Sequence, residues 1–388
     1  MAEQIQDIVL VRRRRIRRRR MQKLFLILMV ILVAIGLYAK RDIWFPKLEG
    51  IGSRYEAIRQ NDGTLAEGNF PLTISGGIDY TVAGLDNYLA ILSDANFYLY
   101  TMDGSLKESR QQAYANAMME TAGKKALIYE SSGNRFRIES KYKTVYSKEL
   151  DERIVFARLS DKGYAAVVTT SEICACVLKV YDDSGKEIYT RDCVDRICDL
   201  AFTKSGDGCT AVMLSAQNGQ IVSTVRAFQF NESSDCWTSE PLDTLCLSVS
   251  NLSDGGVFLM GDTKCAYFDS SGQLTSSYAY TATLVDGACE DGKAALLFEN
   301  EDKRESSLIL LKRTAEEPVE VTFDSVVKAV RVHNGNAYVL TKTIVQGYSF
   351  GGDSEDSVTV SDSYENFLQM EKYMFLLGYD KIDRTDYR

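Results

Sequence analysis

Short apolar stretches separated by turn residues recur along most of the chain, beginning near Tyr80. Each copy has a short strand, a turn, a strongly apolar strand, a second turn and a strand in which apolar and polar residues alternate. The first copy shows this clearly, with LAIL at 89–92, FYLY at 97–100 and a turn at Asp103-Gly104. Short apolar runs and strict alternation, bounded by Gly and Asp, are typical of β-strands joined by hairpins. The pattern therefore predicts a repeated β unit.

The repeat has the length of one blade of a β-propeller. The first strand of each copy is expected near residues 80, 114, 152, 196, 245, 284, 326 and 365, with spacings of 34 to 49 residues. Four-stranded propeller blades have this length. A pair of β-sandwiches would not need one pattern repeated eight times, and the coils of a β-solenoid are shorter. We therefore predict an all-β propeller with eight blades, or seven if the weak copy at 113–147 merges with its neighbour.

The two ends of this region are each too short to make a blade. Residues 365–388 supply two or three strands, whereas 70–77 precede the first copy and have no blade of their own. A circular array avoids open strand edges only if its ends pair, so we expect 70–77 to complete the last blade. The stretch 362–377 also fits a helical pattern, but Asn366–Met370 and Tyr373–Gly378 match strands of the repeat.

An uncharged apolar segment precedes the repeats. Residues 24–39 read LFLILMVILVAIGLYA, which as a helix would cover about 24 Å of a hydrocarbon core of about 30 Å. Flanking Lys and Arg side chains extend toward the headgroups, so we predict one transmembrane helix at 24–41. The alternative is a secretory signal cleaved near Ala34-Ile35-Gly36, but the apolar run continues beyond that point. The predicted organisation is a basic arm at 1–23, the helix, a juxtamembrane stalk at 42–69 and a propeller domain at 70–388.

Charge is divided unevenly about this segment. Residues 1–41 hold 11 of the 45 Lys and Arg and two of the 54 Asp and Glu, so the remainder has 34 basic and 52 acidic side chains, a net of −18. The arginine-rich side of a membrane helix stays in the cytoplasm, which predicts a single-pass protein of the cell membrane with its propeller outside. The acidic domain disfavours nucleic acid as a partner. We interpret the arginine block as a topology signal attracted to anionic lipid.

Seven of the nine cysteines lie between Cys174 and Cys246. They form neither a CxxC pair nor a cluster with histidine, so a zinc site is not expected. Cys174 and Cys176, two apart in the run ICACVLKV, are expected on one face of a strand as buried side chains. We expect mostly free thiols, while a disulfide such as Cys193–Cys198 remains open because an extracytoplasmic compartment permits it.

Several stretches resemble a known family. They are TAGKKALIYESSGNRFRIES with KTVYSKEL at 121–150, GYAAVVTTSEICACVLKVYDDSGKEIYT at 163–190 and SAQNGQIVSTV at 215–225. Together with the arginine-rich start and the apolar segment, they make essentially the whole chain resemble the uncharacterised DUF5711 family of Firmicutes. The resemblance implies a membrane-anchored, propeller-like extracytoplasmic protein. The family has no established activity, so the resemblance implies no catalytic positions.

Few residues offer catalytic chemistry. His333 is the only imidazole, and its place before an Asn-Gly turn is more typical of a solvated histidine than of a catalytic base. Asp182, Asp183 and Asp269 fall in hairpin turns, where Asp is favoured for its backbone hydrogen bonds, and none has the spacing of a calcium loop. We therefore predict no catalytic, cofactor-binding or metal-binding residue, and no cofactor.

Two functions of different class remain. The first is a non-enzymatic binding or scaffolding module, in which a monomeric propeller, anchored in the lipid bilayer through 24–41, presents its loops to a cell-wall component or a surface protein. The alternative is a propeller hydrolase that acts on extracellular glycan with paired carboxylates. An acid cluster at the central channel would favour the enzyme, whereas tyrosines and loops there would favour binding. We expect the binding module and no enzyme activity; the 22 tyrosines are more typical of half-buried sheet faces than of a ligand rim.

Overall fold

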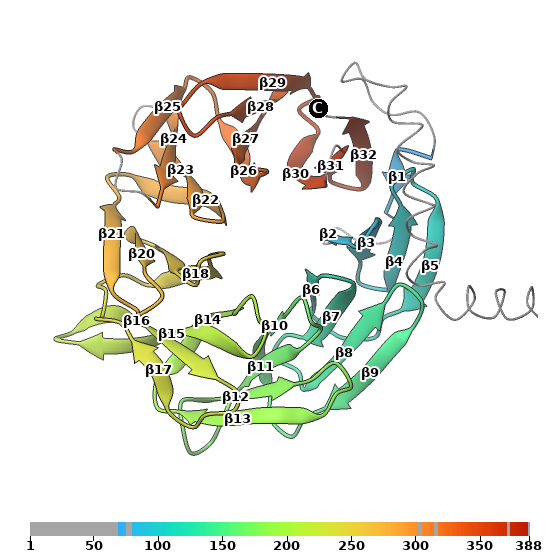
Figure 1. Cartoon of the computed structure of the whole chain (residues 1–388). Helices are drawn as coiled ribbons and strands as arrows, with labels where there is room; N and C mark the ends of the chain where they lie inside the picture. The colour runs from blue at the N-terminus through green and yellow to red at the C-terminus, as the bar shows by residue number, and fades with distance from the viewer. Residues whose placement is uncertain (1–68, 75–79, 301–304, 314–316, 371–372, 387–388) are drawn as a thin grey trace, which may run out of the picture. The chain divides into compact units, whose positions relative to one another are not determined.

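The computed structural model describes residues 69–74, 80–300, 305–313, 317–370 and 373–386. They form eight four-stranded antiparallel sheets that follow one another around a ring (Figure 1). The all-β fold and the eight blades, rather than seven, are confirmed. The predicted arm, transmembrane helix and nearly all of the stalk lie outside the described residues. In the part of the chain that the structure describes, no helix has the length and apolar character needed to cross a membrane.

Each of blades 1 to 7 uses four consecutive strands, and blade 8 combines three C-terminal strands with the first strand of the chain. Blades 1 to 4 contain β2 Thr81–Leu85, β3 Tyr88–Leu92, β4 Asn96–Thr101 and β5 Leu106–Gln111; β6 Ala117–Ala122, β7 Lys125–Glu130, β8 Arg135–Ser140 and β9 Thr144–Glu149; β10 Ile154–Leu159, β11 Ala165–Thr169, β12 Cys176–Tyr181 and β13 Glu187–Cys193; β14 Arg196–Phe202, β15 Gly208–Gln217, β16 Gln220–Gln229 and β17 Asp235–Thr238.

Blades 5 to 8 follow the same order. They contain β18 Cys246–Asn251, β19 Val257–Gly261, β20 Lys264–Phe268 and β21 Leu274–Ala279; β22 Thr283–Glu290, β23 Lys293–Asn300, β24 Glu305–Lys312 and β25 Val319–Phe323; β26 Val327–His333, β27 Asn336–Thr341, β28 Ile344–Tyr348 and β29 Ser354–Thr359; β30 Tyr364–Met370, β31 Tyr373–Gly378, β32 Lys381–Asp386 and β1 Leu72–Thr73. Every first strand begins within three residues of the position that the repeat predicts.

Burial changes from strand to strand within a blade, and this explains the repeated sequence pattern. Every residue of β3 and of β11 is buried, because neighbouring blades cover both faces of a second strand. Such strands are near-continuous apolar runs. The outermost strands β5 and β9 are mostly exposed or half-buried. Their alternating, polar sequences therefore lie on the outer wall of the ring.

The hydrophobic core is divided among the spaces between blades. The cluster between blades 3 and 4 is representative, with Val168, Cys176 and Leu178 on one side and Ile197, Ala211 and Phe228 on the other. Equivalent clusters join the other consecutive blades from blade 1 to blade 8. No blade buries its faces alone, so each depends on both neighbours.

The two ends of the propeller pair with each other, as predicted. Leu72 of β1 lies opposite Ile382 of β32, Thr73 lies opposite Lys381, and the Ile74 amide donates to the Asp380 carbonyl at 2.9 Å. The preference for strands over a helix in 362–377 is also confirmed, by β30 and β31. Blade 8 is thus complete only when the start of the domain joins its end.

Side chains reinforce this closure between blades 8 and 1. Arg384 of β32 is 5% exposed and donates to the carbonyl oxygen of Met102 in blade 1. Its guanidinium lies 5.5 Å from the ring centre of Phe70 and 4.7 Å from that of Tyr373, in the range of cation–π attraction. A charge from the last strand is therefore buried against the first blade.

We expect Arg384→Leu to lower the free energy of unfolding by about 3 kcal/mol, because it removes a buried charge and leaves the groups that surround it, such as the Met102 carbonyl, without their partner. The control is Arg313→Leu, whose side chain is 26% exposed and pairs with an exposed Asp254; this change should cost at most about 1 kcal/mol. Urea unfolding of both variants checks the difference. Equal losses would show that Arg384 contributes no more to closure than a surface arginine does.

Candidate functional site

Six innermost strands contain a β-bulge close to their first residue. The strand register shifts at one residue in each of blades 3 to 8, namely Val155, Cys198, Leu247, Val285, Lys328 and Glu365. A bulge inserts an extra residue and re-aims its side chain. All six lie on the side of the ring on which the innermost strands begin. We call this side the entrance face.

Most of the exposed apolar side chains lie on the entrance face. Among the described residues twelve large hydrophobic side chains are exposed, and the strand order puts nine of them on this face. The other three, Leu106, Tyr142 and Leu274, lie on the opposite face. Six of the nine stand at or just before the start of an innermost strand, and we call them the apolar rim: Met118, Val155, Val194, Leu247, Val285 and Val326.

A cleft of about 810 Å³ opens on the entrance face where blades 8, 1 and 2 meet. Tyr80 and Tyr114 contribute aromatic surface to its walls, and Asp94 and Glu365 contribute carboxylates. Met118 belongs both to the cleft and to the apolar rim. The cleft therefore adjoins the apolar rim at Met118 and has two carboxylates among its lining residues.

Partly buried hydrogen bonds fix the cleft walls. The Gln112 side chain donates to the carbonyls of Asp94 at 2.9 Å and Tyr114 at 3.1 Å, and accepts from the Tyr114 amide at 2.7 Å. The Tyr80 hydroxyl donates to the Gly378 carbonyl at 2.5 Å. Burial, together with the charge of Asp380, raises the pKa of Tyr80 to about 12. The Tyr80 hydroxyl is consequently a neutral hydrogen-bond donor that ties blade 1 to blade 8.

Arg158 links the innermost strands of blades 2, 3 and 4. Its Nη1 lies 2.7 Å from Glu120 Oε1, and its Nη2 lies 2.8 Å from Asp199 Oδ1. The other Asp199 oxygen accepts from the Val249 amide of blade 5 at 2.9 Å. Burial raises the pKa of the Glu120 carboxyl, while the Arg158 charge opposes that shift. The two acids are held by ion pairing and hydrogen bonds.

Arg331 plays the matching part four blades further on. It lies three residues after the bulge of its strand, as Arg158 does, and contacts Asp286 Oδ2 at 3.0 Å and Asn366 Oδ1 at 2.7 Å. The Val330 amide also donates to Asp286 at 3.0 Å. These acids of the innermost strands therefore face arginines.

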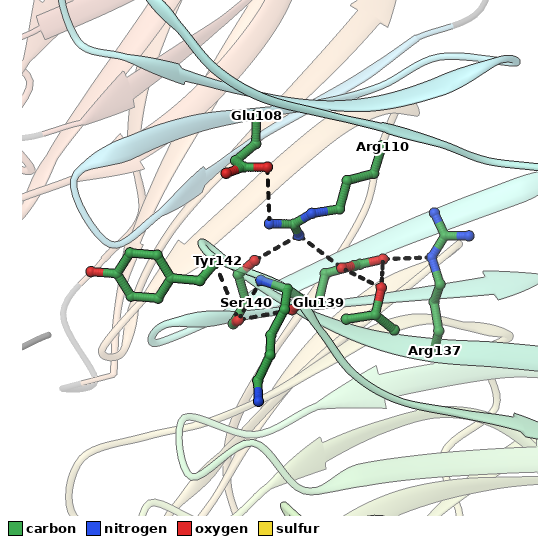
Figure 2. A network of polar contacts seen from close by, with 8 residues as sticks. Glu108, Arg110, Arg137, Glu139, Ser140 and Tyr142 are labelled. Carbon is green, nitrogen blue, oxygen red and sulfur yellow. Dashed lines mark hydrogen bonds and ion pairs between the residues drawn. The ribbon is translucent and has the colours of Figure 1, made fainter.

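A buried carboxylate also joins blades 1 and 2 (Figure 2). Glu139 of β8 is 1% exposed and lies 2.8 Å from Arg110 Nη1 and 2.7 Å from Arg137 Nε. The Thr144 hydroxyl donates to it at 3.0 Å. Arg110 continues to the carbonyl of Ser140 at 2.8 Å. With two arginines and a hydroxyl around it, Glu139 serves as an inter-blade tie.

The acidic residues predicted in hairpin turns are where the sequence placed them. Asp182 Oδ1 accepts from the amides of Ser184 and Lys186, both at 2.9 Å. The Ser184 hydroxyl and these amides hold the pKa of Asp182 below its usual range. The carboxylate of Asp269 has the same arrangement in blade 5, and Asp183 lies within the Asp182 turn. The turn interpretation is confirmed.

His333 ends β26 before the Asn334-Gly335 turn, as predicted, and both turn residues have positive φ, at 50° and 77°. The side chain is half-buried with Nε2 shielded from solvent, so the expectation of a solvated imidazole is wrong. In the strand register it lies opposite Asn336 of the same hairpin. Among the described contacts, no serine, threonine or cysteine is hydrogen-bonded to it.

The cysteines depart in one respect from the expectation. Cys176 begins β12 and is buried, but Cys174 lies half-buried in the preceding turn, because the Ser171 hydroxyl accepts amide bonds there. Cys193 lies opposite Cys176 in the strand register, and the structure has all nine cysteines as free thiols. Within the described ranges, no three His, Cys, Asp or Glu side chains group as metal ligands.

Tyrosines mostly occupy sheet faces, as expected. Tyr98 packs near Tyr100, and Tyr278 near Tyr280, with ring centres 6.1 Å apart in both pairs. The apolar rim is instead mainly aliphatic, and sequence reasoning did not find it. Its residues follow ordinary strand patterns; Val155, Leu247 and Val285 are bulge residues, and only the arrangement of the blades in a ring brings all six to one face.

The comparisons with known proteins agree with this architecture. The model of DUF5711, a family of unknown function, matches residues 72–384. BamB from Moraxella catarrhalis is 13% identical with a TM-score of 0.58, covering 84% of this chain and 97% of that one. Saccharomyces cerevisiae Sqt1 is 10% identical with a TM-score of 0.61, covering 84% and 99%. Such low identities establish the fold alone. A search of the curated proteins found no match.

The turn carboxylates predict a pH dependence. Because the pKa of Asp182 is depressed in the folded state, its stabilisation is present above the unfolded pKa of about 4 and is lost as pH falls through the folded pKa. Asp182→Ala should therefore melt at a lower temperature than wild type at pH 7, and the gap should shrink toward about pH 3. Asp183→Ala, one residue along, is the control and should show a small, constant gap. A gap for Asp182→Ala that stays constant with pH would contradict the prediction.

Proposed function

The chain belongs to the DUF5711 family, and we propose that it is a non-enzymatic binding module whose entrance face receives an extended segment of another protein. The observation that carries the proposal is the one-sided distribution of exposed apolar residues, nine of twelve on that face. Exposed apolar patches on soluble domains mark interaction surfaces. Chance alone would divide them about equally between the two faces.

The chemistry of the cleft indicates which side chains the partner segment should carry. The apolar rim suits aliphatic or aromatic side chains, and it leads at Met118 into a cleft that holds Asp94 and Glu365. The Glu365 side chain is 70% exposed, although Lys328 lies 3.0 Å away. Carboxylates in the cleft favour a cationic group there. The segment we propose therefore has apolar side chains followed by Lys or Arg.

The hydrogen bonds and ion pairs of the entrance face support a binding site that is ordered before the partner binds. Gln112 and Tyr80 fix the cleft walls, while Arg158 and Arg331 tie consecutive innermost strands below the apolar rim. A site that is already ordered loses little conformational freedom when a partner binds. In this proposal the propeller offers a fixed template, and the partner segment adapts to it.

The location proposed for this module is the outer side of the cell membrane. Residues 24–41 would anchor it, with the arginine-rich residues 1–23 in the cytoplasm, and the partner would be a surface protein or a cell-wall component carrying a peptide. The charge division along the sequence supports this orientation. An acidic domain with a net charge of −18 beyond residue 41 would also be held off an anionic bilayer.

A glycan hydrolase is the competing proposal. It would need two carboxylates free to act as acid and base or nucleophile. Glu120, Asp199 and Asp286 are instead engaged by Arg158 and Arg331. The remaining pair of interest, Asp94 and Glu365, lies in the cleft, and release of reducing sugar from cell-wall glycan by wild type but not by Glu365→Gln would support the enzyme.

The binding proposal predicts different outcomes for two leucines of blade 5. Leu247 is 49% exposed on the entrance face, and Leu274 is 48% exposed on the opposite face. Peptides selected on the full chain from a displayed random library should carry apolar residues beside Lys or Arg. Leu247→Glu should weaken their binding about tenfold or more, whereas Leu274→Glu should leave it unchanged. Fluorescence titration measures both affinities.

A photoreactive residue at either position extends this test to intact cells. Substitution at Leu247 should crosslink one discrete partner, and substitution at Leu274 should not. Equal peptide affinities for the two glutamate variants, or crosslinking from Leu274 alone, would contradict the assignment to the entrance face.

Protease added to cells stripped of their wall checks the proposed orientation. It should cut within 42–69 and remove the propeller, while an epitope tag at the N-terminus stays protected, because translocating the arginine block is costly. Lysed cells, in which the tag is accessible, are the control. A mature form that begins near Leu37 would show that the apolar segment is a cleaved signal instead.

A further inference from the structure

Two thiols lie directly opposite each other in blade 3. Cys176 of β12 and Cys193 of β13 are register partners in an antiparallel ladder. Cα atoms of such partners are about 4.5 to 5.5 Å apart, within the range of about 4.4 to 6.8 Å that disulfides span. All nine cysteines lie in described residues, and no other two are register partners. The pair is therefore distinguished by topology.

The surroundings prepare one of the two sulfurs as a nucleophile. Both side chains are 3% exposed. The Ile197 amide donates to Cys176 Sγ at 3.4 Å. The neighbouring Cys193 thiol, together with that amide, lowers the pKa of Cys176 to about 7, and the proximity of Cys176 raises the pKa of Cys193. A thiol of lowered pKa with a second thiol opposite it in the register is the arrangement of an attacking and a resolving cysteine.

We propose that Cys176 and Cys193 are a modification site, at which a disulfide forms by exchange with a low-molecular-weight disulfide. The Cys176 thiolate attacks one sulfur of the small disulfide, whose S–S bond breaks and releases one thiolate. Cys193 then gives its proton to that thiolate and attacks the Cys176 sulfur, which releases the second small thiolate. Two cysteine thiols are oxidised to one disulfide, and the small disulfide is reduced to two thiols.

The bond would act on an edge of the propeller. β13 is the outermost strand of blade 3, and it pairs with β12 alone. Outer edges are the strands that open most readily and that other chains can pair with. A disulfide at Cys193 would fix the last residue of β13, where the chain leaves for the innermost strand of blade 4. It joins the hairpin at its open end, which restricts the unfolded chain most.

The experiment uses the full chain, purified with reductant in nonionic detergent and then incubated with oxidised glutathione. Free thiols are alkylated after denaturation, and the linked peptides are mapped by tandem mass spectrometry. A link between Cys176 and Cys193 is expected, together with a higher melting temperature of the oxidised protein. Because Cys174 shares a tryptic peptide with Cys176, Cys174→Ser is the matched control and should keep both the link and the shift.

Cys176→Ser should lose both, and Cys193→Ser gives the same test if the first variant does not fold. A link from Cys193 to Cys174 or Cys198 would overturn the proposal. So would alkylation of both Cys176 and Cys193 after incubation has gone to completion, since the pair would then resist the exchange that it is proposed to undergo.

Discussion

Pairing between the two ends of the domain is the constraint on which the rest of the propeller depends. Every other blade is built from four consecutive strands, but blade 8 lacks its fourth strand until Leu72 meets Ile382. Each core cluster lies between two blades, so an open ring would expose one face of blade 1 and one face of blade 8. The buried Arg384, against Met102 and Phe70, shows that charge as well as backbone is committed to this junction. Closure thus converts seven local interfaces into a cooperative ring.

The entrance face follows from the same geometry. Because the inner strands of consecutive blades converge on one axis, their first residues are brought together, and a bulge at that point leaves side chains such as Val155 and Leu247 about half exposed. Three residues after the bulge on two of these strands, an arginine pairs with an acid of a neighbouring blade. The ring therefore presents apolar groups at its surface over a layer of ion pairs.

The sequence predicted the blades well and the site poorly, for a physical reason. Local sequence patterns predict the strands of a blade. The second strand AAVVT at Ala165–Thr169 is apolar because neighbouring blades cover both its faces, and the Asp-x-Ser-Gly turns indicate hairpins. The closing strand was predictable because an incomplete blade must find a partner. The apolar rim and the cleft depend on which residues from blades 8, 1 and 2 come together. Tyr80, Asp94 and Glu365 are separated by up to 285 positions, and no local pattern relates them. Cys174 shows the limit at short range, since one hydroxyl at Ser171 delays the strand by two residues.

The position of the cleft connects binding to closure. Its walls come from blade 8 at Asn366 and Gly378, from blade 1 at Tyr80 and from blade 2 at Met118, so it spans the junction that the chain ends create. A ligand that contacts these walls together binds only the closed ring, and by mass action it stabilises that state over any with blade 8 open. The hydrogen bond from Tyr80 to Gly378 already crosses the same boundary. A partner in the cleft would therefore strengthen the contact on which the fold depends, and the propeller would be most resistant to opening while the partner is bound.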